Sequence, residues 1–225
     1  MKTLQQHIHE WKVNDNSIKN IVNNKKYFIY KLNKREPLHI FGQDNGYQNW
    51  PQFDDYYDKV YVNGEPIIIE DNGLTNKEYD PGVYKVEILH IDDVRDCSTM
   101  FCRCIQLIHV PLFNTKNVRD FNCMFCGCYN LETIPLFNTK KAYSLAGMFW
   151  HCRCIKKIPK FNTINVRNMS NMFNECYDLE EVPLFDTKNV NPGGMHDTFK
   201  GCDNLSEKAK YDWSKVYNFI ENHKK

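Results

Sequence analysis

The sequence lacks an excess of charge of either sign, a long apolar run and a glycine-rich phosphate loop, and each absence excludes a class of function. Lysine and arginine number 29 and aspartate and glutamate 28, for a formal net charge of +1. Such a balance gives no field that would attract nucleic acid or anionic lipid. No run approaches the roughly 18 apolar residues of a membrane-spanning helix. We therefore expect no nucleic-acid partner, no membrane span and no nucleotide-binding loop.

Signals for export and for catalysis are also missing. The first ten residues, MKTLQQHIHE, contain no apolar core of a secretory signal, so we expect a cytoplasmic or virion-associated protein rather than a secreted one. The eight histidines fall at unrelated positions, which indicates no pairing with a serine or cysteine nucleophile. The sequence thus predicts no catalytic residue, no cofactor, no metal ligand and no enzymatic activity.

What the sequence does contain is a 24-residue pattern, repeated four times in the second half of the chain and once more in distorted form. Each regular unit carries Met-Phe, then Cys, then Leu or Ile, then Pro and a closing Phe-Asn/Asp-Thr. A fixed period in the twenties predicts stacked units that bury their apolar side chains only against their neighbours. The units begin at Val94, Val118, Ala142, Val166 and, in the distorted copy, Val190.

The ten cysteines divide into two groups. Five share one repeat position, where a small apolar side chain suits a buried turn, and we expect them to form a core ladder of reduced thiols: Cys104, Cys128, Cys152, Cys176 and Cys202. The redox state of the other five is not predicted: Cys97, Cys102, Cys123, Cys126 and Cys154. Repeated Cys-x-Cys pairs leave two alternatives open, a zinc site and a disulfide between Cys102 and Cys126, which share a repeat position.

The chain divides into three parts on these patterns. Residues 1–82 are predicted to be an α+β region of unassigned role, with short helices in residues 1–25 and a β-hairpin at 59–69 around Asn63-Gly64. Residues 83–205 contain the repeats, and the strand-like segment 83–91 is interpreted as a degenerate copy that precedes the first full unit. Residues 206–225 are predicted to be a capping helix that begins after Ser206.

The repeat Met-Phe-x-x-Cys-x-x-Leu-x-x-Ile-Pro-x-Phe-Asp/Asn-Thr-x-Asn-Val resembles the BspA-like leucine-rich repeat of bacterial surface proteins and some viral and phage proteins. The resemblance covers about residues 83–205. It implies an α+β fold: a leucine-rich-repeat solenoid with a short-stranded parallel sheet, preceded by a small β-rich N-terminal cap domain and closed by a C-terminal helix. It also implies adhesion or protein–protein contact, with no cofactor.

Variable positions that stack from repeat to repeat are the expected binding surface of such a protein. Six residues form the candidate partner-binding face, although an ordinary solvated face is the alternative: Tyr129, Arg153, Tyr177, His109, Lys157 and Glu181. Tyrosine and arginine are enriched at binding hot spots. We expect non-catalytic recognition of a protein of a host or an assembly. The alternative is a structural or decorating component of a virion, phage or other assembly, anchored by the N-terminal region.

Overall fold

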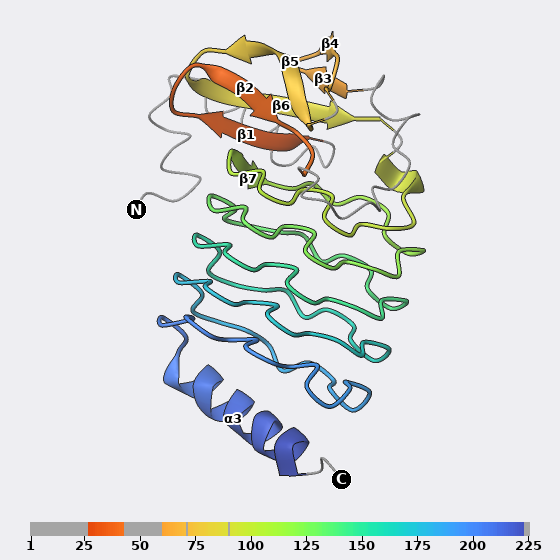
Figure 1. Ribbon diagram of the computed structural model, residues 1–225, viewed down its shortest axis with the longest axis vertical. Coiled ribbons are helices and arrows are strands. Elements are labelled where there is room, and N and C mark those ends of the chain that lie inside the picture. Colours follow the sequence, from red (N-terminus) through yellow and green to blue (C-terminus); the bar gives the residue numbers. More distant parts are fainter. Residues whose placement is uncertain (1–26, 43–59, 71, 90, 223–225) are drawn as a thin grey trace.

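The computed structural model describes residues 27–42, 60–70, 72–89 and 91–222 (Figure 1). Antiparallel sheets form one end of the molecule, stacked turns of chain form the middle, and the helix α3 (Glu207–Asn222) lies at the other end (Figure 1). The short helices expected within residues 1–25 lie outside the described residues.

Two antiparallel sheets build the N-terminal end. The first has five strands in the order β4-β3-β6-β1-β7, and the second pairs β2 with β5. Asn63 and Gly64, with φ angles of 52° and 88°, turn the chain between β3 and β4. A short 3₁₀ helix, η3 (Ile91–Asp93), then leads into the repeats. The strands are β1 (Phe28–Leu32), β2 (Glu36–His39), β3 (Val60–Val62), β4 (Glu65–Ile67), β5 (Leu74–Tyr79), β6 (Gly82–Ile88) and β7 (Leu107–His109).

The predicted fold class is wrong. The structure is mostly antiparallel β-sheet with one short C-terminal helix, and not a leucine-rich-repeat solenoid with a parallel sheet. Within the described ranges the repeats contribute one strand, β7, which pairs antiparallel with β1. Beyond it, strand pairing between neighbouring units is limited to isolated parallel bridges, such as the one between Lys157 and Glu181. The physical reason is the proline that follows soon after each core Leu or Ile, because it has no N–H with which to extend a ladder of strand bonds.

The units hydrogen-bond to one another mainly through their turns. The N–H of Phe125 donates to the carbonyl of Met148 at 2.9 Å, and the N–H of Phe149 donates to that of Met172 at 2.9 Å. Two turn positions in each unit adopt positive φ, which directs peptide groups along the stack rather than around the coil. The first position holds Thr99, Cys123, Gly147 and Asn171, and the second holds Arg103, Gly127, His151 and Glu175.

A column of phenylalanine rings runs through the core from one end to the other. Phe101, Phe125, Phe149, Phe173 and Phe199 stack with neighbouring ring centroids 5.6, 5.8, 5.9 and 5.4 Å apart. Phe28 of β1 extends the column at 5.1 Å from Phe101, and Trp213 of α3 closes it at 5.0 Å from Phe199. The sheet and the helix therefore cover the two apolar ends of the stack.

The five cysteines of the core ladder lie beside this column, and all are buried. The thiol of Cys128 donates to the carbonyl of Phe101 at 2.9 Å, and that of Cys152 donates to the carbonyl of Phe125 at 3.1 Å. Burial raises the pKa of the Cys152 thiol well above its ordinary value, so the side chain stays protonated. Cys176 and Cys202 donate to Phe149 and Phe173 in the same way. Each of these four thiols thus joins its unit to the unit before it.

Candidate functional site

Three residues from successive units form a stacked surface row, which we call the aromatic row: Tyr129, Arg153 and Tyr177. Each follows a cysteine of the core ladder, so the buried thiol fixes where the side chain leaves the surface. The guanidinium carbon of Arg153 lies 4.6 Å from the ring centroid of Tyr129 and 5.5 Å from that of Tyr177. The two rings remain 38% and 37% exposed. The structure therefore brings these three predicted residues into direct contact.

A polar pair on the adjacent turn position supports the aromatic row. The hydroxyl of Tyr177 donates to Oε2 of Glu175 at 2.7 Å, and Nδ1 of His151 lies 2.9 Å from the same oxygen. The ring of His151 meets that of Tyr129 edge-on, with centroids 6.3 Å apart. The Tyr177 hydroxyl lowers the pKa of Glu175, and the nearby His151 acts in the same direction. Glu175 thus carries its negative charge directly beside the row.

The other three candidate residues lie on a second row, which follows the isolated bridges between units. Nζ of Lys157 lies 2.8 Å from Oε1 of Glu181, and both side chains are well exposed. Nδ1 of His109 lies 3.2 Å from the hydroxyl of Thr133, and burial lowers the pKa of the His109 ring. The structure brings Lys157 and Glu181 together, whereas His109 lies two units away from Lys157 and contacts Thr133. These side chains are engaged with their neighbours along the stack.

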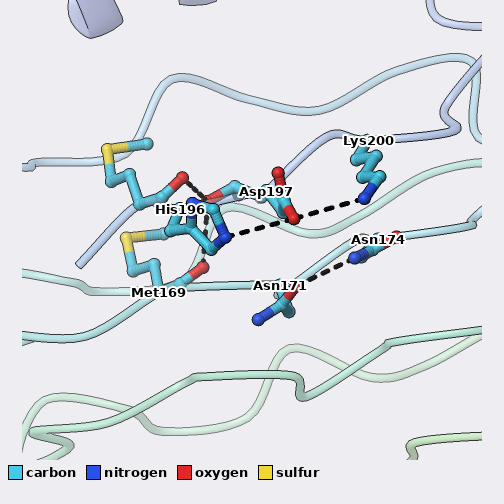
Figure 2. A network of polar contacts seen from close by, with 8 residues as sticks. Met169, Asn171, Asn174, His196, Asp197 and Lys200 are labelled. Carbon is cyan, nitrogen blue, oxygen red and sulfur yellow. Dashed lines mark hydrogen bonds and ion pairs between the residues drawn. The ribbon is translucent and has the colours of Figure 1, made fainter. Parts of the chain in front are cut away.

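The distorted last unit holds a polar network near the C-terminal end of the stack (Figure 2). Oδ2 of Asp197 lies 3.2 Å from Nε2 of His196 and 3.5 Å from Nζ of Lys200. The buried hydroxyl of Thr198 is 3.0 Å from the carbonyl of Met169 in the unit before. The Thr198 bond holds the longer turn of this unit against its neighbour, while the two ion pairs lie within the turn, and we assign these contacts a structural role.

Sequence reasoning missed an exposed apolar row. Leu112, Leu136 and Leu184 are 47%, 59% and 44% exposed, and each follows the proline of its unit. Lys160 stands at the equivalent position of the third unit. Comparison of the units column by column would have revealed the row. Its interruption by a lysine distinguishes it from the aromatic row, whose three members contact one another.

Two properties of the described residues bear on the class of site. No group of three or more His, Cys, Asp and Glu side chains in this part of the chain has the geometry to hold a metal ion. Among the described helices, none has both the length and the apolar character needed to cross a membrane.

The stacked units, with one cysteine of the core ladder and one to three phenylalanines each, define a repeat protein. The chain belongs to the family described as Mycoplasma protein of unknown function, DUF285, whose model matches residues 95–213, more than half of the chain. This family is related to the BspA-like proteins, but the match does not identify the units as leucine-rich repeats. No curated protein and no solved structure matches the chain.

Proposed function

We propose that this protein recognises another protein, without catalysis, through the aromatic row. The observation that supports the proposal is the contact of Arg153 with both Tyr129 and Tyr177 on an exposed surface. Tyr and Arg are the residue types that most often carry binding energy at protein interfaces. The relation of the family to BspA-like proteins adds support for a role in adhesion-type contact.

The row is ordered before any partner arrives. A free arginine side chain loses rotamer freedom when it is immobilised in an interface, at a cost of about 0.5–1.5 kcal/mol. Arg153 is already held between two rings, and Tyr177 is already fixed by its bond to Glu175. A partner that covers these rings would therefore gain buried apolar area with little further loss of side-chain entropy.

A binding experiment with a matched control tests the proposal. The intact protein, a Tyr129→Ala/Tyr177→Ala variant and a Tyr143→Ala/Tyr211→Ala control would each be used to capture proteins from extracts, and the affinity of each captured protein would be measured. The control removes two tyrosines that are 48% and 60% exposed but lie outside the row. We expect the row variant to lose about 30-fold or more in affinity, the loss typical of a hot spot, and the control to bind as before.

Two results would contradict the proposal. Equal losses in both variants would mean that any exposed tyrosine contributes and that the row is not a site. Binding that survives in the row variant but disappears when residues 1–25 are deleted would favour the alternative, an assembly component held by its N-terminal region. Far-UV circular dichroism of each variant separates loss of binding from loss of folding.

A further inference from the structure

Three cysteines outside the core ladder gather on the flank of the first two units. Cys102, Cys123 and Cys126 form this group, which we call the thiol cluster, and all three are half-buried and free. The thiol of Cys126 is within hydrogen-bonding reach of both Cys102 and Cys123. No partner-binding residue proposed above belongs to the cluster. The cluster therefore needs an explanation that neither the core nor the aromatic row supplies.

Backbone hydrogen bonding sets Cys102 beside Cys126 of the neighbouring unit. They occupy the same position in adjacent units, and the N–H of Arg103 donates to the carbonyl of Cys126 at 2.6 Å. Phenylalanine rings one residue earlier in the same two units stack 5.6 Å apart. The ring spacing shows how closely the two units stack. Residues at equivalent positions of units stacked this closely suit a disulfide, whose Cα atoms lie about 4.4–6.8 Å apart.

The environment divides the thiols of the cluster into nucleophile and proton donor. A hydrogen bond from Cys126 and the positive charge of Arg103 lower the pKa of Cys102, against the opposing effect of burial. Hydrogen bonding to both neighbours and burial raise the pKa of Cys126. Thiolates are the reactive form of cysteine, and a lowered pKa with partial exposure is typical of oxidation-sensitive sites. The buried ladder has neither property.

We propose that Cys102 and Cys126 are an oxidation site for hydroperoxides, which converts them into a disulfide between the first two units. The Cys102 thiolate attacks the peroxide oxygen, the O–O bond breaks, and a sulfenic acid forms while the leaving oxygen takes up a proton as water. The Cys126 sulfur then attacks the Cys102 sulfur, and its proton leaves with the sulfenic oxygen as a second water. Two thiols and one hydrogen peroxide give one disulfide and two waters.

Cys102, rather than Cys123, is assigned as the attacking residue for two reasons. It shares the stacking position of Cys126 in the neighbouring unit, and it stands next to Arg103. Cys123 is held in a turn with a φ of 55°. A hydrogen bond from Cys126 lowers the pKa of Cys123, but burial and the negative charge of Asp120 oppose the shift, and no arginine stands beside it in the sequence. The disulfide would connect two units that are already hydrogen-bonded, so the core remains in place.

The experiment uses the full chain, reduced and then treated with hydrogen peroxide. Free thiols are counted after denaturation, and non-reduced peptides are mapped by mass spectrometry with fragmentation, because Cys97 and Cys102 lie close together in the sequence. We expect the loss of two thiols and a link between Cys102 and Cys126. Cys126→Ser should abolish the link and leave a sulfenic acid on Cys102 that dimedone traps. Cys123→Ser and a control, Cys154→Ser, should retain the link.

The wild-type map decides the outcome even where a variant fails to fold. A link between Cys123 and Cys126, or oxidation to intermolecular dimers alone, would overturn the assignment of the pair. Thiol loss in Cys126→Ser equal to that of wild type, with no adduct on Cys102, would overturn the mechanism. The result is independent of partner binding, because none of the measurements involves the aromatic row.

Discussion

Replacement of Thr115 by valine tests whether the hydrogen bonds between units hold the stack together. Thr115 is 1% exposed and sits at the closing turn of the first unit. Its hydroxyl donates to the carbonyl of Asn138 at 3.2 Å and accepts from the N–H of the same residue at 2.9 Å. One side chain therefore satisfies both peptide groups of a residue in the next unit, and valine would leave both without their partner.

The magnitude follows from that geometry. A buried donor or acceptor that loses its partner costs about 1–3 kcal/mol. Both bonds to Asn138 are only partly buried, so water can replace some of what is lost and the lower end applies to each. Two groups at about 1 kcal/mol each give about 2 kcal/mol for Thr115→Val. Thr115→Ser keeps the hydroxyl and removes one methyl group, which costs about 1 kcal/mol.

Urea unfolding followed by circular dichroism measures both changes. Thr133→Val serves as a surface control. Thr133 is exposed, and its hydroxyl contact with His109 is exposed to water as well, so the change should stay within about 0.5 kcal/mol of wild type. If Thr115→Val were as stable as wild type while Thr115→Ser was weakened, packing of the methyl group and not the hydroxyl would be holding the units. The reasoning about inter-unit hydrogen bonds would then be refuted.

Three further changes test other parts of the structure by the same unfolding assay. Gly127 has a φ of 75°, so Gly127→Ala should cost about 1 kcal/mol, because a Cβ disfavours this conformation. Trp213 is 3% exposed and covers Phe199 at the end of the ring column, so Trp213→Ala should cost about 3–5 kcal/mol. Burial lowers the pKa of His39 from 6.5, so protons bind the unfolded chain more readily. The stability that the neutral His39 ring contributes is fully present above about pH 6.5 and is lost as the pH falls through the folded-state pKa. His39→Gln should therefore make the loss of stability at low pH less steep.

Each of these expectations has an outcome that would contradict it. A Gly127→Ala variant as stable as wild type would show that the turn tolerates a side chain. Little effect of Trp213→Ala would mean that α3 does not close the core. If stability fell with pH as steeply in His39→Gln as in wild type, another group would be responsible for the loss. Burial also lowers the pKa of His109, so a small residual dependence on pH should remain.

The period and the inward-facing residues could be predicted from sequence because both are local, repeated signals. Each regular unit places Phe and Cys at the same offsets from its start, and identical units stack in register. Asn63-Gly64 is a local signal of the same kind, and β3 and β4 pair around it. The direction of the sheets could not be predicted in this way. The strand direction depends on which peptide groups pair. In this molecule β7 pairs antiparallel with β1, and most other peptide groups of the repeats bond through the turns.

The contacts of the candidate site were only partly accessible to sequence reasoning. The shared repeat position predicts that Tyr129 and Tyr177 lie on either side of Arg153. It does not predict the bond between Tyr177 and Glu175, which depends on a turn with positive φ. The same type of turn brings Cys123 to Cys126, a contact that the sequence did not suggest. The sequence signal for these turns was glycine, since Gly147 and Gly127 occupy the first and second positive-φ turn positions of their units.

The phenylalanine column has a regular spacing from one unit to the next. Adjacent rings are 5.4–5.9 Å apart from Phe101 to Phe199, so the distance between the sheets and α3 is set by how many units lie between them. Because each unit presents the same apolar surfaces to both neighbours, a copy inserted between Thr139 and Ala142 would find partners ready above and below. Duplication of the gene segment for one unit would therefore lengthen the stack by a fixed step, with no change to the sheets or to α3.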